Sequence, residues 1–261
     1  MEEYDILTHQ RSGSNKTLAI AAAVSFLLIA TGAAYWSIYY NQHHISSPQS
    51  LVHDIAPGSS KATLTLANGQ QIILDEAGPG NIAQAPGITI KKTGTGQIIY
   101  TLTGESTADQ INMVTTPKGG QYELVLEDGT KVWLNAGSKL SYPVSFSRLK
   151  KREVQLEGEA YFEVTKNPVK PFSVRSTEQL VTVTGTHFDV SCYPENKSIH
   201  TTLSEGSVEV YQPRTKKTQK LRPGQQTILS QESIRVIEVN PEDYTSWKDG
   251  SFSFNNTPIR E

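Results

Sequence analysis

Three glutamates lie close together in the segment LEGEAYFEV, at Glu157, Glu159 and Glu163. Two carboxyl groups about 5–10 Å apart are what glycoside hydrolysis needs, one as a general acid and the other as a base or nucleophile. A glycosidase that uses Glu157 and Glu159 is therefore one hypothesis. The glutamates, however, alternate with apolar residues, and this period of two is typical of a β-strand with one core face and one solvated face. We interpret them as solvated strand residues and expect the chain not to be an enzyme.

Neither the cysteine nor the histidines form a pattern that predicts catalysis or metal binding. Cys192 is the only cysteine, and it lies on the apolar side of the predicted strand THFDVSCY. We therefore expect a small buried side chain and not a nucleophile. The adjacent pair His43–His44 lacks further ligands at a suitable spacing. We expect no bound metal and no cofactor.

The densest basic cluster is the segment SRLKKRE, which contains Arg148, Lys150, Lys151 and Arg152. The formal net charge of the chain is −2 at pH 7, so no overall field attracts it to nucleic acid. The cluster also lacks the interleaved aromatic residues of a nucleic-acid patch. We interpret it as a turn with solvated charges and expect no nucleic-acid partner.

A stretch without charged residues, 17–40, lies near the N-terminus. As a helix, its 24 residues would extend about 36 Å, against about 30 Å for the hydrocarbon core of a bilayer. Aromatic rings suit the membrane–water boundary, and four of them cluster at the end of the stretch: Tyr35, Trp36, Tyr39 and Tyr40. The sequence predicts one transmembrane helix.

The flanking charges predict the orientation of this helix. Arg11 and Lys16 precede it, whereas no Lys or Arg follows it before Lys61. Basic residues stay on the cytoplasmic side, so we expect a cytoplasmic N-terminus and an extracytoplasmic body. The alternative is a cleaved signal peptide with an apolar run at 19–29 and small residues at 32–34. We favour the retained anchor because the apolar run continues into the aromatic cluster.

A phrase of the form Leu-x-x-Gly-x-x-x-x-Leu occurs three times beyond the anchor, as LANGQQIIL, LEDGTKVWL and LRPGQQTIL. Asn-Gly, Asp-Gly and Pro-Gly are turn signals, so we predict three β-hairpins. Val125 and Trp133 would share the outer face of the second hairpin, where they can pair across the strands. Residue parity predicts the buried faces: Leu64, Leu66, Ile72 and Leu74; Tyr122, Leu124, Leu126, Val132 and Leu134; Leu221 and Leu229.

Other stretches also read as strands. THFDVSCY places Phe188, Val190 and Cys192 on one face and His187, Asp189 and Ser191 on the other. SEGSVEVY turns at Glu205-Gly206 and returns through Val208 and Val210. No convincing amphipathic helix occurs between positions 62 and 238. The predicted fold is an all-β extracytoplasmic domain of many short antiparallel strands, sandwich- or β-helix-like, preceded by one transmembrane helix.

The order of these motifs resembles a known family. The run TPKGGQYELVLEDGTKVWLNAGSKLSYPVSF, followed by REVQLEGEAYFEV, PFSV, VTGTHFDV, TTLSEGSVEV, LRPGQQ and WKDGSFSF, is similar to the FecR-type regulators of Bacteroidetes over about 62–254. The residues that carry these motifs, which we expect to be structural, are Pro117, Gly119, Gly120, Asp128, Gly129, Trp133, Leu134, Asn135, Tyr142, Pro143, Gly158, Glu159, Ala160, Tyr161, Phe162, Gly185, Thr186, Phe188, Glu205, Gly206, Pro223, Gly224, Trp247, Phe252 and Phe254.

The resemblance implies a single-pass anti-sigma factor of the bacterial inner membrane. Such proteins bind an extracytoplasmic-function sigma factor on the cytoplasmic side. In the periplasm they sense the signalling domain of a TonB-dependent outer-membrane transporter, and regulated proteolysis then frees the sigma factor. The alternative for this chain is a membrane-anchored periplasmic carbohydrate-binding or scaffold module that uses exposed aromatic residues such as Trp133.

The resemblance also predicts the domain organisation. We expect a short cytoplasmic segment at 1–16, the transmembrane helix at 17–40, a periplasmic tether at 41–61, the FecR-like β domain at 62–240, and at 241–261 the start of a truncated C-terminal α/β module. Relatives carry a helical sigma-binding domain before the anchor, so we expect this sequence to lack most of it. Relatives also commonly have Asn at the position of Asp189.

Overall fold

The structure is a computed structural model that describes residues 15–43, 59–85, 87–103 and 110–251. The chain divides into two compact units, 1–55 and 56–261. The first unit contains the helix α1 (Asn15–His43). Its part Ile20–Tyr40 has a mean hydropathy of 1.6 and no buried residue, so it is long and apolar enough to cross a membrane. Residues 44–58 of the predicted tether, His44 among them, lie outside the described residues, whereas 41–43 belong to α1.

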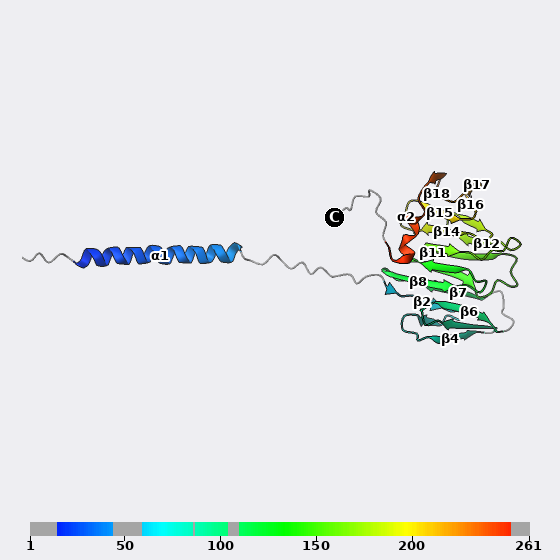
Figure 1. Ribbon diagram of the computed structural model, residues 1–261, viewed down its shortest axis with the longest axis horizontal. Helices are drawn as coiled ribbons and strands as arrows, with labels where there is room; N and C mark the ends of the chain where they lie inside the picture. The colour runs from blue at the N-terminus through cyan, green and yellow to red at the C-terminus, as the bar shows by residue number, and fades with distance from the viewer. Residues whose placement is uncertain (1–14, 44–58, 86, 104–109, 252–261) are drawn as a thin grey trace, which may run out of the picture. The chain divides into compact units, whose positions relative to one another are not determined.

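The second unit is built from short strands followed by two short helical turns (Figure 1). The strands are β1 (Ser59–Ser60), β2 (Thr63–Thr65), β3 (Gln71–Ile73), β4 (Gly80–Ala85), β5 (Ile88–Lys92), β6 (Ile98–Leu102), β7 (Ile111–Thr115), β8 (Gly120–Val125), β9 (Lys131–Leu134), β10 (Lys139–Pro143), β11 (Arg152–Glu163), β12 (Phe172–Arg175), β13 (Leu180–Val183), β14 (His187–Cys192), β15 (Ile199–Glu205), β16 (Val208–Gln212), β17 (Lys217–Leu221), β18 (Gln225–Leu229) and β19 (Ile234–Glu238). The helical turns are α2 (Glu242–Thr245) and the 3-10 helix η1 (Ser246–Asp249).

The strands form two sheets that share β11. The first sheet has the order β3-β2-β7-β10-β11-β12-β13-β16-β17. The second has the order β4-β5-β6-β8-β9-β11-β14-β15-β18-β19. Most pairs are antiparallel, but β1–β8, β6–β8 and β11–β12 are parallel. The predicted all-β body after one apolar helix is confirmed.

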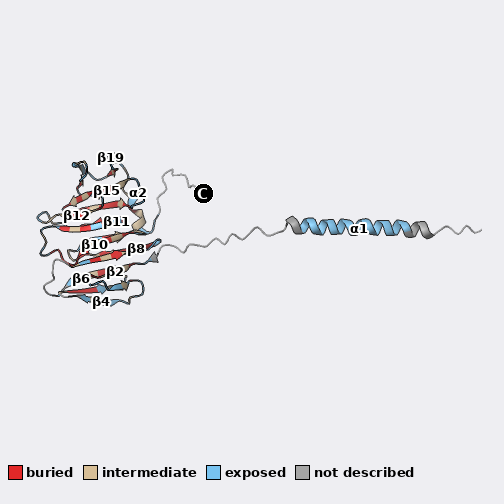
Figure 2. Ribbon diagram, turned by 180° about the vertical axis from the view of Figure 1, so that it is seen from behind, coloured by how far each residue is buried: buried red, intermediate tan, exposed pale blue. Residues whose placement is uncertain are grey.

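The hydrophobic core lies entirely within the second unit. Its buried residues run from Ala62 to Leu229, and Figure 2 shows them along the strands of the body. Alternation along each strand places one set of side chains in this core and the other set on an outer face. Cys192 is one of the buried residues, at 7% exposure, as predicted. Burial raises the pKa of its thiol to about 12, so the thiolate form is scarce at neutral pH.

Two of the three predicted hairpins are present. Strands β2 and β3 pair across the turn at Gly69, and β8 and β9 pair across the turn at Gly129; both glycines have positive φ, 85° and 82°. The predicted pairing of Val125 with Trp133 is wrong. Leu126 N donates to Thr130 O at 2.8 Å, and in this register Trp133 lies opposite Glu123.

The third copy of the phrase turns as predicted but is not a hairpin. Gly224 has a φ of 83°, yet β17 before it pairs in the first sheet and β18 after it pairs in the second. The Glu205-Gly206 turn likewise carries the chain from β15 in the second sheet to β16 in the first. Both predictions of a local return were wrong, because a glycine turn fixes the backbone angle but not the sheet that the next strand joins.

Strand β11 joins the sheets through Gly158. Its first half pairs with β10 and β12 in the first sheet, and its second half pairs with β9 and β14 in the second. Gly158 has a φ of 95°, and a Cβ there would lie 2.5 Å from Ser138 Oγ. Only glycine fits both the angle and the space. This junction sets the register of the strands that build the site described below.

Candidate functional site

The C-terminal segment, defined as Glu242–Asp249, contacts the outer face of the second sheet. Gln121 Nε2 of β8 donates to Trp247 O at 3.5 Å. The ammonium of Lys248 lies 5.3 Å from the ring centre of Tyr161 and 6.0 Å from that of Trp133. The region that follows β19 therefore reaches strands far away in sequence. We call the sheet residues beneath it, together with their neighbours in the adjacent row, the covered face: Gln121, Trp133, Asn135, Glu159, Tyr161, Asp189 and Ser191.

The register of three strands assembles the covered face. Trp133 of β9 lies opposite Tyr161 of β11, and Tyr161 lies opposite Asp189 of β14. The adjacent row pairs Glu159 with Ser191. Flanking residues of opposite parity, such as Phe162 and Val190, are fully buried in the core. The alternation of each strand therefore presents these side chains outward, toward the C-terminal segment.

An aromatic pair forms the centre of the covered face. The rings of Trp133 and Tyr161 are 5.7 Å apart at 61°, and Lys248 adds a cation–π contact to both. A hollow of about 220 Å³ beside them is lined by Ser60, Gln121, Tyr122, Glu123, Trp133, Leu134, Trp247 and Lys248. Trp133 is half-buried, so it is not the exposed aromatic residue that the carbohydrate-binding alternative needed.

Two carboxyl groups lie in the covered face, contrary to the prediction that the glutamates of LEGEAYFEV are all solvated. Glu159 is half-buried and accepts a hydrogen bond from Asn135 Nδ2. Asp189 is only 2% exposed. Glu157 is exposed, as predicted, and pairs with the first sheet opposite Lys139. Glu163 is half-buried and lies 3.5 Å from Lys131. The proposed glycosidase pair is therefore split between the two sheets.

The surroundings of both carboxyl groups favour the protonated form. Burial raises the pKa of Asp189 well above its ordinary value; the nearby Glu159 carboxylate raises it further, and Trp247 lowers it. Burial also raises the pKa of Glu159, against the lowering effect of hydrogen bonds from Asn135 and Ser191. Asp189 Oδ1 and Trp247 Nε1 are both buried without a hydrogen-bond partner among the described residues. A protonated acid can remain in this site at low cost, whereas an ionised one is only partly compensated by these hydrogen-bond donors.

This arrangement suits a conditional contact better than hydrolysis. Asp189 has no access to a substrate, because it is buried beneath the C-terminal segment. Within the described residues, no three His, Cys, Asp or Glu side chains come together as metal ligands. What the arrangement can do is make the attachment of the segment depend on the protonation of these acids, because burial favours the neutral form of Asp189 whereas the Trp247 side chain favours the ionised form.

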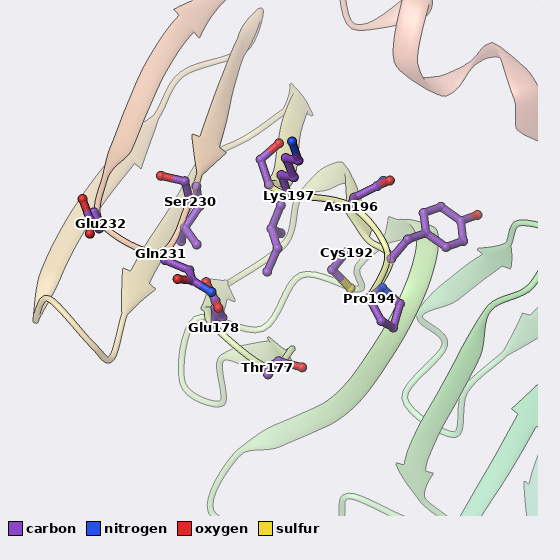
Figure 3. A pocket seen from close by; sticks show the side chains of 13 residues that line it. Thr177, Glu178, Cys192, Pro194, Asn196, Lys197, Ser230, Gln231 and Glu232 are labelled. Atoms are coloured by element: carbon purple, nitrogen blue, oxygen red, sulfur yellow. The ribbon is translucent and has the colours of Figure 1, made fainter.

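A larger hollow lies at one end of the body, away from the covered face. It measures about 570 Å³ and is lined by residues from the turns 177–178, 193–199 and 229–232. Figure 3 shows Asn196 and Pro194 on one side of it, Ser230 and Gln231 on the other, and Thr177 below. Its side chains are mostly polar, but Cys192 of the strand THFDVSCY and Leu229 of the third repeated phrase also line it.

The comparisons with known proteins bear on this fold and site. The family model described as FecR protein matches residues 112–209. Two crystal structures of a candidate anti-sigma factor from Parabacteroides distasonis ATCC 8503, at 2.50 and 1.65 Å resolution, are each 34% identical to the chain with a TM-score of 0.53. The first match covers 57% of this chain and 70% of that one, and the second covers 56% and 69%. The chain belongs to the FecR family. No curated protein matches it.

The FecR motif residues fall into three groups in the structure. One group lies on the covered face or contacts it: Trp133, Asn135, Glu159, Tyr161 and Trp247. A second lies in the core: Leu134, Tyr142, Ala160, Phe162 and Phe188. A third lies at turns, at the β11 junction or near them: Pro117, Gly119, Gly120, Asp128, Gly129, Pro143, Gly158, Gly185, Thr186, Glu205, Gly206, Pro223 and Gly224. Phe252 and Phe254 lie outside the described residues.

Arg152 is a FecR-family residue whose role the sequence analysis missed. It was predicted to be solvated, but it is 2% exposed. Its Nη1 donates to Asp128 Oδ2 at 2.7 Å and to Thr165 O at 3.0 Å, and its guanidinium lies 5.5 Å from the ring centre of Phe172. Alternation with the buried Val154 and Leu156 was the available signal, because it places Arg152 on the core side of β11.

Gln121, Lys248 and Asp189 were also missed as members of one site. Gln121 Nε2 donates to Asn135 Oδ1 at 3.1 Å and so connects β8 to the Glu159 side chain. Lys248 comes from a segment more than a hundred residues further along the chain. The parity of THFDVSCY placed Asp189 on the outer face correctly, but no sequence signal indicated that this face is covered.

Proposed function

We propose that this FecR-family anti-sigma regulator relays a signal from a TonB-dependent outer-membrane transporter to an extracytoplasmic-function sigma factor. The signal would cross the bacterial inner membrane through α1, with the N-terminus in the cytoplasm and the β body in the periplasm. The observation that carries the proposal is the joining, in one chain, of an apolar helix able to span a membrane to a FecR body. A sensor on one side can then act on a partner on the other.

The domain boundaries proposed from the sequence fit this plan. They are a cytoplasmic segment at 1–16, a span at 17–40, a tether at 41–61, a sensing domain at 62–240 and a C-terminal module that begins at 241. The helix α1 extends from Asn15 to His43 and includes the proposed span. The last strand, β19, ends at Glu238, close to the proposed boundary.

Within this plan, the covered face is the part of the body best suited to respond to a partner. Its contacts with the C-terminal segment include a weak hydrogen bond at 3.5 Å, two cation–π contacts and the interaction of the Trp247 side chain with Asp189. A partner that binds the C-terminal module could displace this segment at low cost. We propose that such displacement is the step by which the periplasmic body registers the transporter.

The test is a reporter for the candidate partner sigma factor, in strains that lack one component each. Deletion of the gene should make the reporter active without an inducing ligand, because the anti-sigma restraint is lost. Deletion of only the transporter's signalling domain should leave the reporter silent with or without ligand. An unchanged reporter after gene deletion would contradict the anti-sigma activity. Normal induction without the signalling domain would contradict the transporter relay alone.

Orientation is tested separately with alkaline phosphatase fusions. A fusion after Ser47 should be active and one after Ser14 inactive, because the enzyme folds only outside the cytoplasm. The reverse pattern would contradict the proposed topology. A shortened soluble product that begins near Tyr35 would instead identify a cleaved signal peptide.

A further inference from the structure

Two neighbouring loops at one end of the body carry six cations and no carboxylate. The first, 144–152, contains Arg148, Lys150, Lys151 and Arg152, and the second, 164–171, contains Lys166 and Lys170. Strand register places them at the same end, because Arg152 lies opposite Phe172, the residue that follows the second loop. We call these two loops the basic end.

Two of the six cations hold the loops together from within. The ammonium of Lys170 donates to the backbone carbonyls of Phe146 and Ser147 in the first loop. Arg152 Nε in turn donates to Lys170 O at 2.9 Å, which adds a second link between the two loops. With these charges engaged internally, the relative position of the two loops is fixed, so that they present one surface.

The other four cations are exposed on this surface: Arg148, Lys150, Lys151 and Lys166. Lys151 is paired with Glu153, whereas Lys150 and Lys166 make no hydrogen bond or ion pair within the described part of the chain. In the second loop, Val169 is 93% exposed. In the sequence it lies between Pro168 and Lys170, whose ammonium is bound to the first loop. A hollow of about 430 Å³ beside Lys150 adds apolar walls from Ile111, Pro143, Leu149 and Val154.

An exposed aliphatic side chain on a surface that carries several cations is suited to the boundary of a bilayer. Cations bind the anionic headgroups, each strengthening adsorption about fivefold, and an aliphatic side chain enters the adjoining apolar layer. A protein partner would need paired geometry, such as a forked arginine contact or a groove between the loops. The basic end instead spreads single charges over two loops. Such a pattern suits a partner that is recognised by its density of negative charge, as a layer of anionic headgroups is.

We propose that the basic end docks on the anionic surface of the membrane that α1 enters. This inference is independent of the sigma factor and the transporter. The fifteen residues at 44–58 can span at most about 50 Å, whereas a six-residue strand of the body extends about 20 Å. If the basic end rests on the membrane, the tether has to span the length of the body, because β1 joins the body at the opposite end, beside Gly120. The tether is long enough for this. Because α1 keeps the body near the bilayer, a weak affinity is sufficient for docking.

The experiment uses the full chain in lipid nanodiscs, with an environment-sensitive fluorophore at Val169→Cys. Labelling should be specific, because the only native cysteine, Cys192, is buried. In discs with 30% phosphatidylglycerol, we expect a blue-shifted emission and quenching by spin-labelled lipid. Both signals should be absent in pure phosphatidylcholine discs and should disappear in about 1 M salt, where the Debye length falls to about 3 Å. The same label at Thr177→Cys, at the other end of the body, should show neither signal.

Charge variants then test whether the basic end is responsible. Lys150→Gln with Lys166→Gln should reduce the ratio of docked to free protein about 25-fold, the product of two fivefold effects. The matched pair Lys197→Gln with Lys217→Gln removes the same charge elsewhere and should leave the docked fraction unchanged. Emission at position 169 that is equal in anionic and neutral discs would overturn the proposal. An equal loss of the docked fraction in the two double variants would also overturn it. An acidic protein that binds the basic end while the label stays in water would likewise assign this surface to another partner.

Discussion

Two buried charges in the same body have opposite surroundings. Arg152 is enclosed by an Asp128 carboxylate, two backbone carbonyls and the Phe172 ring, although its Nη2 is buried without a hydrogen-bond partner among the described residues. Asp189 is equally buried, yet its Oδ1 has no partner among the described residues and a second carboxyl group lies nearby. The buried cation has a carboxylate as its partner, whereas the buried acid lies beside a second acid and has only the Trp247 side chain to favour its ionised form.

This difference separates a permanent contact from a conditional one. The Arg152 cluster joins the β8–β9 turn to the loop after β11 through an ion pair and hydrogen bonds to backbone carbonyls. The covered face depends on carboxyl groups whose protonation can change. A regulator needs both kinds of contact: a body that keeps its shape, and one segment whose attachment responds to conditions.

Breaking the permanent contact should have the largest effect. Arg152→Ala leaves Asp128 without its cation and should lower the free energy of unfolding by about 3–5 kcal/mol. Urea unfolding at pH 7 measures this, with Lys150→Ala as the control, because Lys150 is exposed and close in sequence. A loss below about 1 kcal/mol for Arg152→Ala would mean that the cluster is not a structural contact.

Distorting the turn that Arg152 supports should have a smaller effect. Gly129 has a φ of 82°, and a Cβ there would lie 3.2 Å from Thr165 Oγ1. Gly129→Val should therefore cost about 1–3 kcal/mol. Gly78→Val is the control, because the space around Gly78 is open and its φ is not in the left-handed region. Equal thermal melts for the two variants would show that the turn tolerates a β-branched residue.

Removing the uncompensated acid should stabilise the protein. Asp189→Asn leaves a neutral group of the same shape and should raise the free energy of unfolding at pH 7 by about 1–3 kcal/mol. The sign follows from the raised pKa in the folded state. The native state holds its proton more tightly than the unfolded chain, so stability is complete below the unfolded pKa of about 3.9 and falls as pH rises through the folded pKa.

Unfolding measured from pH 4 to pH 8 therefore tests this prediction. The wild type should lose stability across that range relative to Asp189→Asn, and the two should converge at the acid end. Asp75→Asn, at an exposed position, supplies the control for a change of one charge. A variant that is less stable than the wild type at pH 7 would show that the Asp189 carboxylate is compensated by a group not described above.

Weakening the attachment of the C-terminal segment should have the smallest effect on global stability. Trp247→Ala takes away the ring that lies over Asp189 and should cost about 1 kcal/mol, because Trp247 is only half-buried. Hydrogen exchange should instead show a local change, with faster exchange at Gly250, whose N–H donates to Trp247 O at 3.0 Å. Unchanged exchange there would contradict the attachment of the segment through Trp247.

The sequence predicted elements better than it predicted their partners. The Asn68-Gly69 and Asp128-Gly129 hairpins were correct because their signals are local: a turn residue with positive φ and parity on both sides. The Pro223-Gly224 and Glu205-Gly206 turns obey the same local rule, but the following strands join the other sheet. That choice depends on the space left beside β15 and β13, which no short stretch of sequence encodes.

The candidate site was predicted in part for the same reason. Parity placed Asp189 and Glu159 on an outer face, and this was correct. The burial of that face depends on Trp247 and Lys248, which lie more than fifty residues away from both carboxyl groups. Arg152 was misread because charge density predicted solvation, whereas its position in the alternation of β11 predicted burial. Where these two signals disagree, alternation was the better guide here.

The most direct test is the titration of the Asp189 side-chain carboxyl by carbon-detected NMR, with Asp189→Asn to assign its resonance. The account predicts that this carboxyl keeps its proton well above the ordinary pKa of 3.8. It also predicts that the resonances of Trp247 and Lys248 shift over the same pH interval, because their contacts with the covered face depend on its charge. Titration of Asp189 near 3.8, with Trp247 unaffected, would contradict a conditional contact at the covered face.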